Sequence, residues 1–257
     1  MYAQAYFDYD SKKSGGVTMS HLRFGKKPIK STYLIHKANF VACHNPSYVN
    51  KYNMVQELVD GGTFLLNCAW DMEGLEKHLP GQVKAFIANH NIKFYTIDGV
   101  KIGIETGMGP TRINTILQSA FFKLTGIIPE DQAIDLMKAA AKATYGRKGD
   151  DVVQKNWAAI DAGAKQVVEI QVPESWKNAE DEGLHMTHAT EGRQDVIDFV
   201  NNIQAKVNAQ EGNSLPVSAF KDYVDGSTPS GTSAYEKRGV AVDVPVWNSA
   251  NCIQCNI

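Results

Sequence analysis

Two cysteines near the C-terminus have the spacing of metal ligands. Cys252 and Cys255 stand in the run Asn-Cys-Ile-Gln-Cys-Asn-Ile, which ends the sequence at residue 257. In the bacterial cluster run C-x2-C-x2-C-x3-C, the third thiolate would come directly after that residue. The same pair also fits half of a zinc site or a redox dithiol. We therefore predict that Cys252 and Cys255 are ligands of a [4Fe-4S] cluster whose other ligands lie beyond residue 257.

A loop rich in lysine and glycine is the strongest candidate for ligand binding in the first half of the chain. It reads Ser-Lys-Lys-Ser-Gly-Gly over residues 11–16. The glycines let backbone N–H groups turn toward an anion, and the lysines and hydroxyls supply charge and donors. Lys26, Lys27 and Lys30 follow within one strand length and extend the positive surface. The alternative is a solvated turn, which composition alone favours.

A second candidate precedes a predicted helix. The run Gly107-Met-Gly-Pro-Thr-Arg112 leads into a helix with Asn114 in its first turn. Unpaired N–H groups and partial positive charge at a helix start favour an anion or a polar ligand group. The run lacks the third glycine of a dinucleotide fingerprint and follows no clear strand, which excludes that motif. Alternatively, Pro110 and Thr111 simply start the helix, and Asn156, early in a later helix, is a surface residue.

No complete catalytic apparatus is visible in the sequence. His44, His185 and His188 lack a second ligand pair at zinc-like spacing, so we interpret them as structural or exposed. The sequence shows no Ser-His-Asp order, P-loop or paired-carboxylate pattern.

Composition excludes several classes of protein. The formal net charge of −2 over 257 residues gives no sign of a nucleic-acid-binding face. No apolar run reaches the length of a membrane span, and the N-terminus lacks a secretion pattern. Cys43 and Cys68 lie in apolar runs, where buried free thiols are usual, so we expect a reducing cytoplasm.

The pattern of elements predicts an α/β fold. Residues 2–9, 17–24, 39–43, 63–68 and 92–97 read as strands, with helical patterns at 54–59 and 82–88. Three longer amphipathic helices follow at 112–124, 129–145 and 151–162, and a further one at 195–207. Short buried strands between helices indicate a Rossmann-like, mostly parallel sheet with helices on both faces. The segment 215–247, rich in Gly, Ser, Thr and Pro, predicts an extended irregular arm.

Long motifs in this order resemble pyruvate:ferredoxin (flavodoxin) oxidoreductase. They are Tyr-Phe-Asp-Tyr-Asp-Ser-Lys-Lys-Ser-Gly-Gly-Val-Thr-Met-Ser-His-Leu-Arg-Phe-Gly at 6–25, Gly-Met-Gly-Pro-Thr-Arg-Ile-Asn-Thr at 107–115, Ala-Tyr-Glu-Lys-Arg-Gly-Val-Ala-Val-Asp-Val-Pro-Val-Trp at 234–247, and the terminal Cys-Ile-Gln-Cys. The resemblance covers essentially the whole chain. It implies four parts: a gamma-type domain over 1–178 that lacks its first strand and turn, a helical linker over 179–213, a segment named for its Glu-Lys-Arg triplet over 214–247, and the start of a ferredoxin domain over 248–257.

The resemblance also implies the chemistry of a parent enzyme. That family uses thiamine diphosphate with Mg²⁺ and [4Fe-4S] clusters to convert pyruvate and coenzyme A to acetyl-coenzyme A and CO₂. Its electrons pass to ferredoxin or flavodoxin, and the parent is expected to be a cytoplasmic homodimer. The partners of this chain would then be the other domains of the parent, and the chain alone is expected to be inactive.

Three residues match coenzyme A contacts of the gamma-type domain. They are Lys12, Asn114 and Asn156. A lysine offers a point charge to a phosphate, and an asparagine offers both a donor and an acceptor. The resemblance therefore favours the ligand interpretation of the 11–16 loop. The alternative is a domain that only fixes the geometry of its neighbours.

Overall fold

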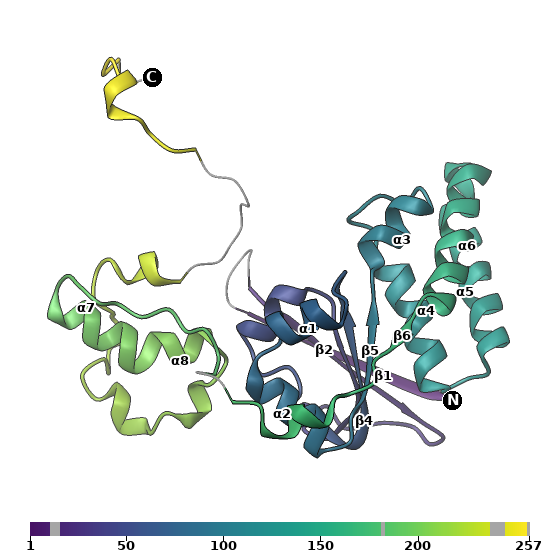
Figure 1. The fold of residues 1–257 in the computed structure, drawn as a ribbon, viewed down its shortest axis with the longest axis horizontal. Helices are drawn as coiled ribbons and strands as arrows, with labels where there is room; N and C mark the ends of the chain where they lie inside the picture. The colour runs from purple at the N-terminus through teal and green to yellow at the C-terminus, as the bar shows by residue number, and fades with distance from the viewer. Residues whose placement is uncertain (11–15, 181–182, 237–244, 256–257) are drawn as a thin grey trace. The chain divides into compact units, whose positions relative to one another are not determined.

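The computed structural model describes residues 1–10, 16–180, 183–236 and 245–255 (Figure 1). The chain divides into two compact units. The hairpin unit comprises residues 1–33, 187–205 and 215–257, and the sheet unit comprises residues 34–186 and 206–214. Among the described residues, no helix has both the length and the apolar character that crossing a membrane requires.

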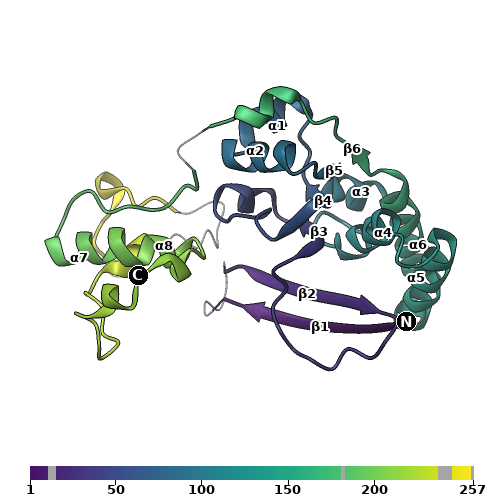
Figure 2. The same cartoon turned by 90° about the horizontal axis from the view of Figure 1, so that it is seen from below.

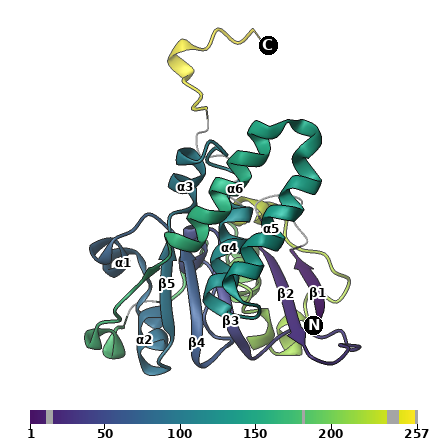
Figure 3. The same cartoon turned by 90° about the vertical axis from the view of Figure 1, so that its right-hand side faces the viewer.

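A four-stranded sheet forms the centre of the sheet unit. Its strands β3 (Ala38–Cys43), β4 (Leu58–Asn67), β5 (Lys93–Ile97) and β6 (Val168–Glu169) are ordered β3-β4-β5-β6. The first three are parallel, and the short β6 pairs antiparallel with β5. Figure 3 shows β3, β4 and β5 side by side. The predicted mostly parallel sheet is confirmed, and β6 was missed because two residues carry no pattern.

Helices cover both faces of this sheet, as predicted (Figure 2). On one face, α1 (Met72–His78) and α2 (Gly81–Asn89) pack with Phe64 and Leu66 of β4. On the other, α3 (Gly99–Glu105), α4 (Asn114–Thr125) and α6 (Asp150–Lys165) pack with Leu65. The switch from residue 64 to 65 follows from side chains that alternate along a strand. The helix α5 (Glu130–Tyr145) packs against α6.

Two short helices, α1 and α3, were not predicted. Each begins directly after a capping aspartate that follows a strand. Asp71 Oδ1 accepts a hydrogen bond from Gly74 N at 2.9 Å, and Asp98 Oδ1 accepts one from Lys101 N at 2.9 Å. Glycine inside both helices weakened the helical pattern, since glycine has low helix propensity. The two aspartates were the signal that could have revealed both helices, since aspartate is a favoured N-cap residue.

The helix predicted at 54–59 is wrong. This segment is a turn that leads into β4, with Leu58 N donating to Val55 O at 3.0 Å. Both side chains are buried in the core on the α1 and α2 face. Apolar residues three positions apart fit a turn as well as a helix, and so few residues cannot separate the two.

The backbones of helices α4 and α6 approach each other closely. Ser119 Oγ of α4 donates to Ile160 O of α6 at 2.6 Å. A Cβ at Gly163 would lie 2.4 Å from the carbonyl oxygen of Ile116. Because a side chain at 163 would collide with backbone, glycine permits this approach. Ile116 lies opposite Gly163 and Ser119 opposite Ile160, so the two helices run antiparallel.

An antiparallel hairpin begins the hairpin unit. Its strands are β1 (Tyr2–Tyr9) and β2 (Thr18–Gly25), as predicted to within a residue. Tyr9 pairs with Thr18 at one end, and Tyr2 pairs with Gly25 at the other. Figure 2 shows the two strands side by side.

The rest of the hairpin unit is organised around a helical segment. The helix α7 (Gln194–Phe199) is followed by a π-helical turn at Val200–Gln204 and then by α8 (Ala205–Asn208), of which only Ala205 belongs to this unit. Val196 and Val200 pack with Ala189 and Tyr235. Beyond Leu215 the described residues form short 3-10 turns and irregular chain, with neither α-helix nor strand. This agrees with the predicted helical linker and extended irregular arm.

Candidate functional site

The carboxyl ends of the parallel strands are joined by one buried amide. Asn67, at the end of β4, is 4% exposed. Its Nδ2 donates to His44 O at 2.9 Å, and its Oδ1 accepts from Gly99 N at 2.9 Å. One side chain therefore fixes the loop after β3 and the start of α3. In open parallel sheets, ligands bind outside this edge, so Asn67 positions the region where a site is expected.

Two thiols and one imidazole near this edge have pKa values shifted toward their uncharged forms. Burial raises the pKa of Cys43 to about 12, and its Sγ contacts Asn45 O at 3.1 Å. Burial also raises the pKa of Cys68 and lowers the pKa of His44. Thiols that stay protonated are poor nucleophiles, and a neutral imidazole carries no charge. Both cysteines are free and buried, as expected for core thiols.

The glycine loop predicted as a ligand site lies against α6. Gly107 and Gly109 adopt φ of +74° and +84°, a region that other residues rarely adopt. A Cβ at Gly107 would lie 3.1 Å from Cε of Lys155. The loop therefore contacts the residue that directly precedes Asn156. The positive φ values show that the glycines serve the turn itself.

Asn156 is buried, although its sequence context indicated a surface residue. It is 2% exposed, and its Nδ2 donates to Val152 O one turn earlier at 2.8 Å. Its Oδ1 has no hydrogen-bond partner among the residues that the structure describes. A buried, unpaired carbonyl oxygen costs on the order of 1–3 kcal/mol. Such an atom is satisfied when a donor from a ligand or a water reaches it.

Asn114 is an exposed residue at the start of α4. The antiparallel pairing of α4 and α6 places position 114 opposite position 165, about nine positions from Asn156. At about 1.5 Å per residue, the two asparagines are separated by roughly 13 Å along the helix axes. They lie on one packed helix pair, too far apart to hold one phosphate and close enough to hold the two ends of an elongated ligand.

Lys155 is a cation that the sequence analysis did not single out. Its Nζ pairs with Asp151 Oδ2 at 2.6 Å, and its side chain is 43% exposed. Its side chain lies beside Gly107, and it can turn toward an anion at modest cost, because exposed ion pairs are weak. Its four-residue spacing from Asp151 resembled an ordinary helix surface pair, so spacing alone did not reveal it.

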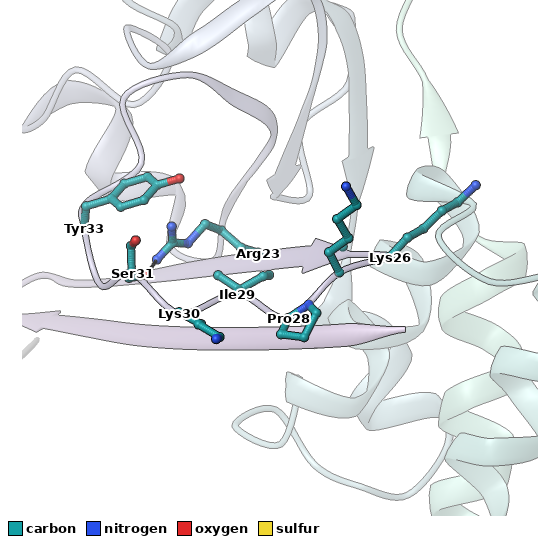
Figure 4. A pocket seen from close by; sticks show the side chains of 9 residues that line it. Arg23, Lys26, Pro28, Ile29, Lys30, Ser31 and Tyr33 are labelled. Carbon is teal, nitrogen blue, oxygen red and sulfur yellow. Dashed lines mark hydrogen bonds between the residues drawn. The ribbon is translucent and has the colours of Figure 1, made fainter.

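Lys12 lies outside the described residues, and the other lysines do not form one site. Lys26 follows the end of the hairpin where Tyr2 pairs with Gly25, about 24 Å along the strands from the opposite end. Lys26, Lys27 and Lys30 line a surface hollow of about 540 Å³ with Arg23 and Tyr33. Figure 4 shows Lys26 and Lys30 pointing in different directions. They therefore do not converge on a single anion.

The arginine in this hollow is held by its neighbours. Arg23 donates to Gln4 Oε1 and, at 2.5 Å, to Ser31 O. Its guanidinium carbon lies 3.8 Å from the centre of the Tyr33 ring, and Figure 4 shows it pointing toward Tyr33 and Ser31. We interpret Arg23 as fixing the segment after β2.

The terminal cysteine pair is accessible. Cys252 and Cys255 are free and exposed, as metal ligands near a surface can be. Among the described residues, no group of three or more His, Cys, Asp and Glu side chains is placed to hold a metal ion. The role of Cys252 and Cys255 as cluster ligands stays a prediction.

Comparison with known proteins matches both parts of the chain. Residues 1–166 match the family model described as pyruvate ferredoxin/flavodoxin oxidoreductase. Residues 187–241 match a second model, described as a domain of unknown function. A crystal structure of pyruvate oxidoreductase subunit PORC from Thermotoga maritima is similar at a TM-score of 0.51 and 19% identity, covering 66% of this chain and 82% of that one. This likeness concerns the fold alone.

Curated relatives match over nearly the whole chain. The pyruvate-flavodoxin oxidoreductase of Enterobacter agglomerans is 52% identical and the pyruvate:ferredoxin oxidoreductase of Moorella thermoacetica is 50% identical, each over 100% of this chain and 21% of the relative. A mitochondrial pyruvate dehydrogenase [NADP(+)] of Euglena gracilis is 41% identical over 98% of this chain and 14% of its own length. The chain thus spans about a fifth of the bacterial relatives, and it belongs to the pyruvate ferredoxin/flavodoxin oxidoreductase family.

Proposed function

We propose that this chain contributes coenzyme A binding and domain scaffolding to an enzyme that oxidises pyruvate. The parent would use thiamine diphosphate with Mg²⁺ and [4Fe-4S] clusters and transfer electrons to ferredoxin or flavodoxin. The names and full-chain identity of the bacterial relatives support this proposal. We further propose the domain boundaries given above, a cytoplasmic location and a homodimeric parent.

The unpaired Oδ1 of Asn156 is the observation that carries the binding proposal. Coenzyme A has amide and amino donors in its pantetheine and adenine parts, and either can donate to this oxygen. Because Asn156 is 2% exposed, a ligand reaches it only after neighbouring side chains move.

The remaining contacts fit an elongated, phosphate-bearing ligand. Asn114 supplies an exposed amide about 13 Å from Asn156 along the helix axes, and Lys155 supplies a cation beside Gly107. Lys12 would supply a further cation for a phosphate, because charge-assisted hydrogen bonds are the strong ones. Asn114, Lys155 and Asn156 would hold separate parts of one ligand, while the chemistry of pyruvate takes place on other domains.

Cys252 and Cys255 would supply two of the four thiolates of a cluster. Both cysteines are free and exposed, so two further thiolates could complete a cluster site with them. A bound cluster would supply one-electron transfer. This chain's own residues would hold one side of it.

Replacing Asn156 by leucine separates binding from folding. Leucine has a similar shape and removes the unpaired oxygen, so Asn156→Leu should leave the chain as stable as before or more so. The coenzyme A dissociation constant should rise about three- to tenfold, as expected for one neutral hydrogen bond. Isothermal titration with coenzyme A and thermal unfolding measure the two effects.

The competing proposal is a scaffold without its own ligand. The hydrogen bond from Asn156 Nδ2 to Val152 O favours it, since this amide also has a structural partner. In that case, coenzyme A would not bind, or would bind equally to wild type, Asn114→Ala and Asn156→Leu. Gln118→Ala, at an exposed α4 position, is the matched control and should leave affinity unchanged.

A further inference from the structure

Positive charge is concentrated in one stretch of the chain. Of the 26 lysines and arginines, eight lie within residues 11–56, and none of the 28 aspartates and glutamates does. The formal net charge of the whole chain is −2, so the remaining residues carry an excess of acidic groups. A segment of one sign attracts partners of the opposite sign.

Four of these cations line the surface hollow that follows β2. This hollow of about 540 Å³, which we call the basic hollow, has Arg23, Lys26, Lys27 and Lys30 in its lining and no acidic residue. The three lysines are exposed. Within the described part of the chain none of them forms an ion pair, unlike Lys123 of α4, whose Nζ lies 2.5 Å from a carboxylate. Their charges are therefore free to meet an external anion.

The basic hollow also offers apolar surface. Pro28, Ile29 and the ring of Tyr33 line it, and Tyr33 is 60% exposed. The lysines spread outward from this surface, since Figure 4 shows Lys26 and Lys30 pointing in different directions. A ligand that matches the basic hollow therefore carries several separated negative charges together with an apolar group.

An acidic peptide segment has this chemistry. Carboxylates spaced along a chain reach lysines that point apart, whereas a single phosphate does not meet them together. The excess of acidic groups in the remaining residues repels the continuous phosphate backbone of a nucleic acid. Lysine is depleted in permanent apolar interfaces, while complementary charge speeds the encounter of partners that associate and dissociate. The charge of the basic hollow therefore favours a separate protein over a permanently packed domain.

We propose that the basic hollow is a docking surface for an acidic segment of a separate protein. The carboxylates of this segment meet Lys26, Lys27 and Lys30, and an apolar side chain of the segment lies against Ile29 and Tyr33. The surface is distinct from the proposed coenzyme A contacts, because the hairpin register carries these lysines to the end opposite the 11–16 loop.

Fluorescence anisotropy with a labelled acidic peptide, in which glutamates flank one leucine, tests the proposal. The peptide should bind the chain at low salt and bind at least tenfold more weakly at about 0.5 M salt, because salt screens exposed charges. The triple variant Lys26→Ala, Lys27→Ala and Lys30→Ala should raise the dissociation constant about tenfold, since each exposed ion pair contributes roughly a factor of two. Thermal unfolding should be unchanged, because the three side chains are exposed.

A matched variant separates the basic hollow from the general charge of the chain. Lys77→Ala, Lys93→Ala and Lys142→Ala together remove the same charge from exposed positions on α1, β5 and α5. This variant should change the dissociation constant less than about twofold.

Two further measurements identify the occupant. Replacing the leucine of the peptide by serine should weaken binding about threefold, because the apolar contact with Ile29 and Tyr33 is lost. The acidic peptide should bind the full-length polypeptide as tightly as it binds this chain, because a separate partner requires the basic hollow to be open there.

Four results would overturn the proposal. Absence of peptide binding at low salt would refute it directly, and equal losses in the two triple variants would leave only the general charge of the chain. Tighter binding of tripolyphosphate or of a single-stranded oligonucleotide than of the peptide would assign the basic hollow to a phosphate-bearing ligand. Loss of peptide binding in the full-length polypeptide would show that another part of that polypeptide covers the basic hollow.

Discussion

Asn67 should be among the most sensitive positions of the sheet unit. Asn67→Ala removes both hydrogen bonds that join the loop after β3 to the start of α3. The N–H of Gly99 is buried and would lose its partner, which costs about 1–3 kcal/mol. The carbonyl of His44 lies in a more open loop where water can replace the amide, which costs about 1 kcal/mol or less. The sum is a loss of about 1–4 kcal/mol in the free energy of unfolding.

Thermal unfolding measures this loss. For a unit of this size, 1 kcal/mol corresponds to about 2–4 °C in Tm, so Asn67→Ala should lower Tm by roughly 2–16 °C. The matched control is Asn114→Ala, which alters an exposed asparagine and should change stability by less than about 0.5 kcal/mol. If Asn67→Ala lowered Tm no more than Asn114→Ala, the amide would not hold the edge of the sheet, and our account of this region would fail.

Three other predictions concern packing, pH and thiol reactivity. Gly163→Ala should destabilise the chain by about 1–3 kcal/mol in denaturant unfolding, because the new Cβ meets the backbone of Ile116 at 2.4 Å; Gly146→Ala, where nothing lies within 4 Å of the added Cβ, should be neutral or stabilising. The pKa of Glu76 is lowered by hydrogen bonds from Trp176 Nε1 at 2.5 Å and Lys84 Nζ at 3.1 Å. The Glu76 carboxylate therefore stabilises the fold above its ordinary pKa of 4.5, and this contribution is lost as pH falls through the lowered pKa. Unfolding measured between pH 3 and 7 should be less pH-dependent in Glu76→Gln, and an unchanged profile would refute the assignment. Ellman's reagent at pH 7 should titrate Cys252 and Cys255 in the native chain and reach Cys43 and Cys68 only after unfolding; rapid reaction of four thiols in the native chain would show the core cysteines to be accessible.

Strong periodicity made most of the fold predictable. The strands at 2–9 and 39–43 and the amphipathic helices α4, α5 and α6 were found because alternation and three-to-four spacing extend over many residues. Short elements were not found. The segment at 54–59 mixed a turn with the first residues of β4, while α1 and α3 carry glycines that weaken the helical pattern.

The candidate site was harder to predict because it depends on contacts between distant segments. Motif resemblance identified Asn114 and Asn156, but local sequence gave no sign that Asn156 would be buried with an unpaired oxygen. The roles of Asn67 and Lys155 follow from which loops meet in space, as in the hydrogen bond from Gly99 to Asn67. Lys26, Lys27 and Lys30 appeared close to the 11–16 loop in sequence, yet the hairpin register carries them to its other end.

The most direct test of the proposed function uses Lys12 in the full-length polypeptide. A lysine-phosphate hydrogen bond is worth on the order of 1–3 kcal/mol, so Lys12→Ala should raise the coenzyme A concentration needed for half-maximal pyruvate oxidation by roughly ten- to a hundredfold. Pyruvate decarboxylation measured without coenzyme A should be almost unchanged, because we propose that other domains perform that step. An equal loss in both assays would mean that Lys12 supports the fold rather than the ligand, and would contradict the coenzyme A role proposed for this chain.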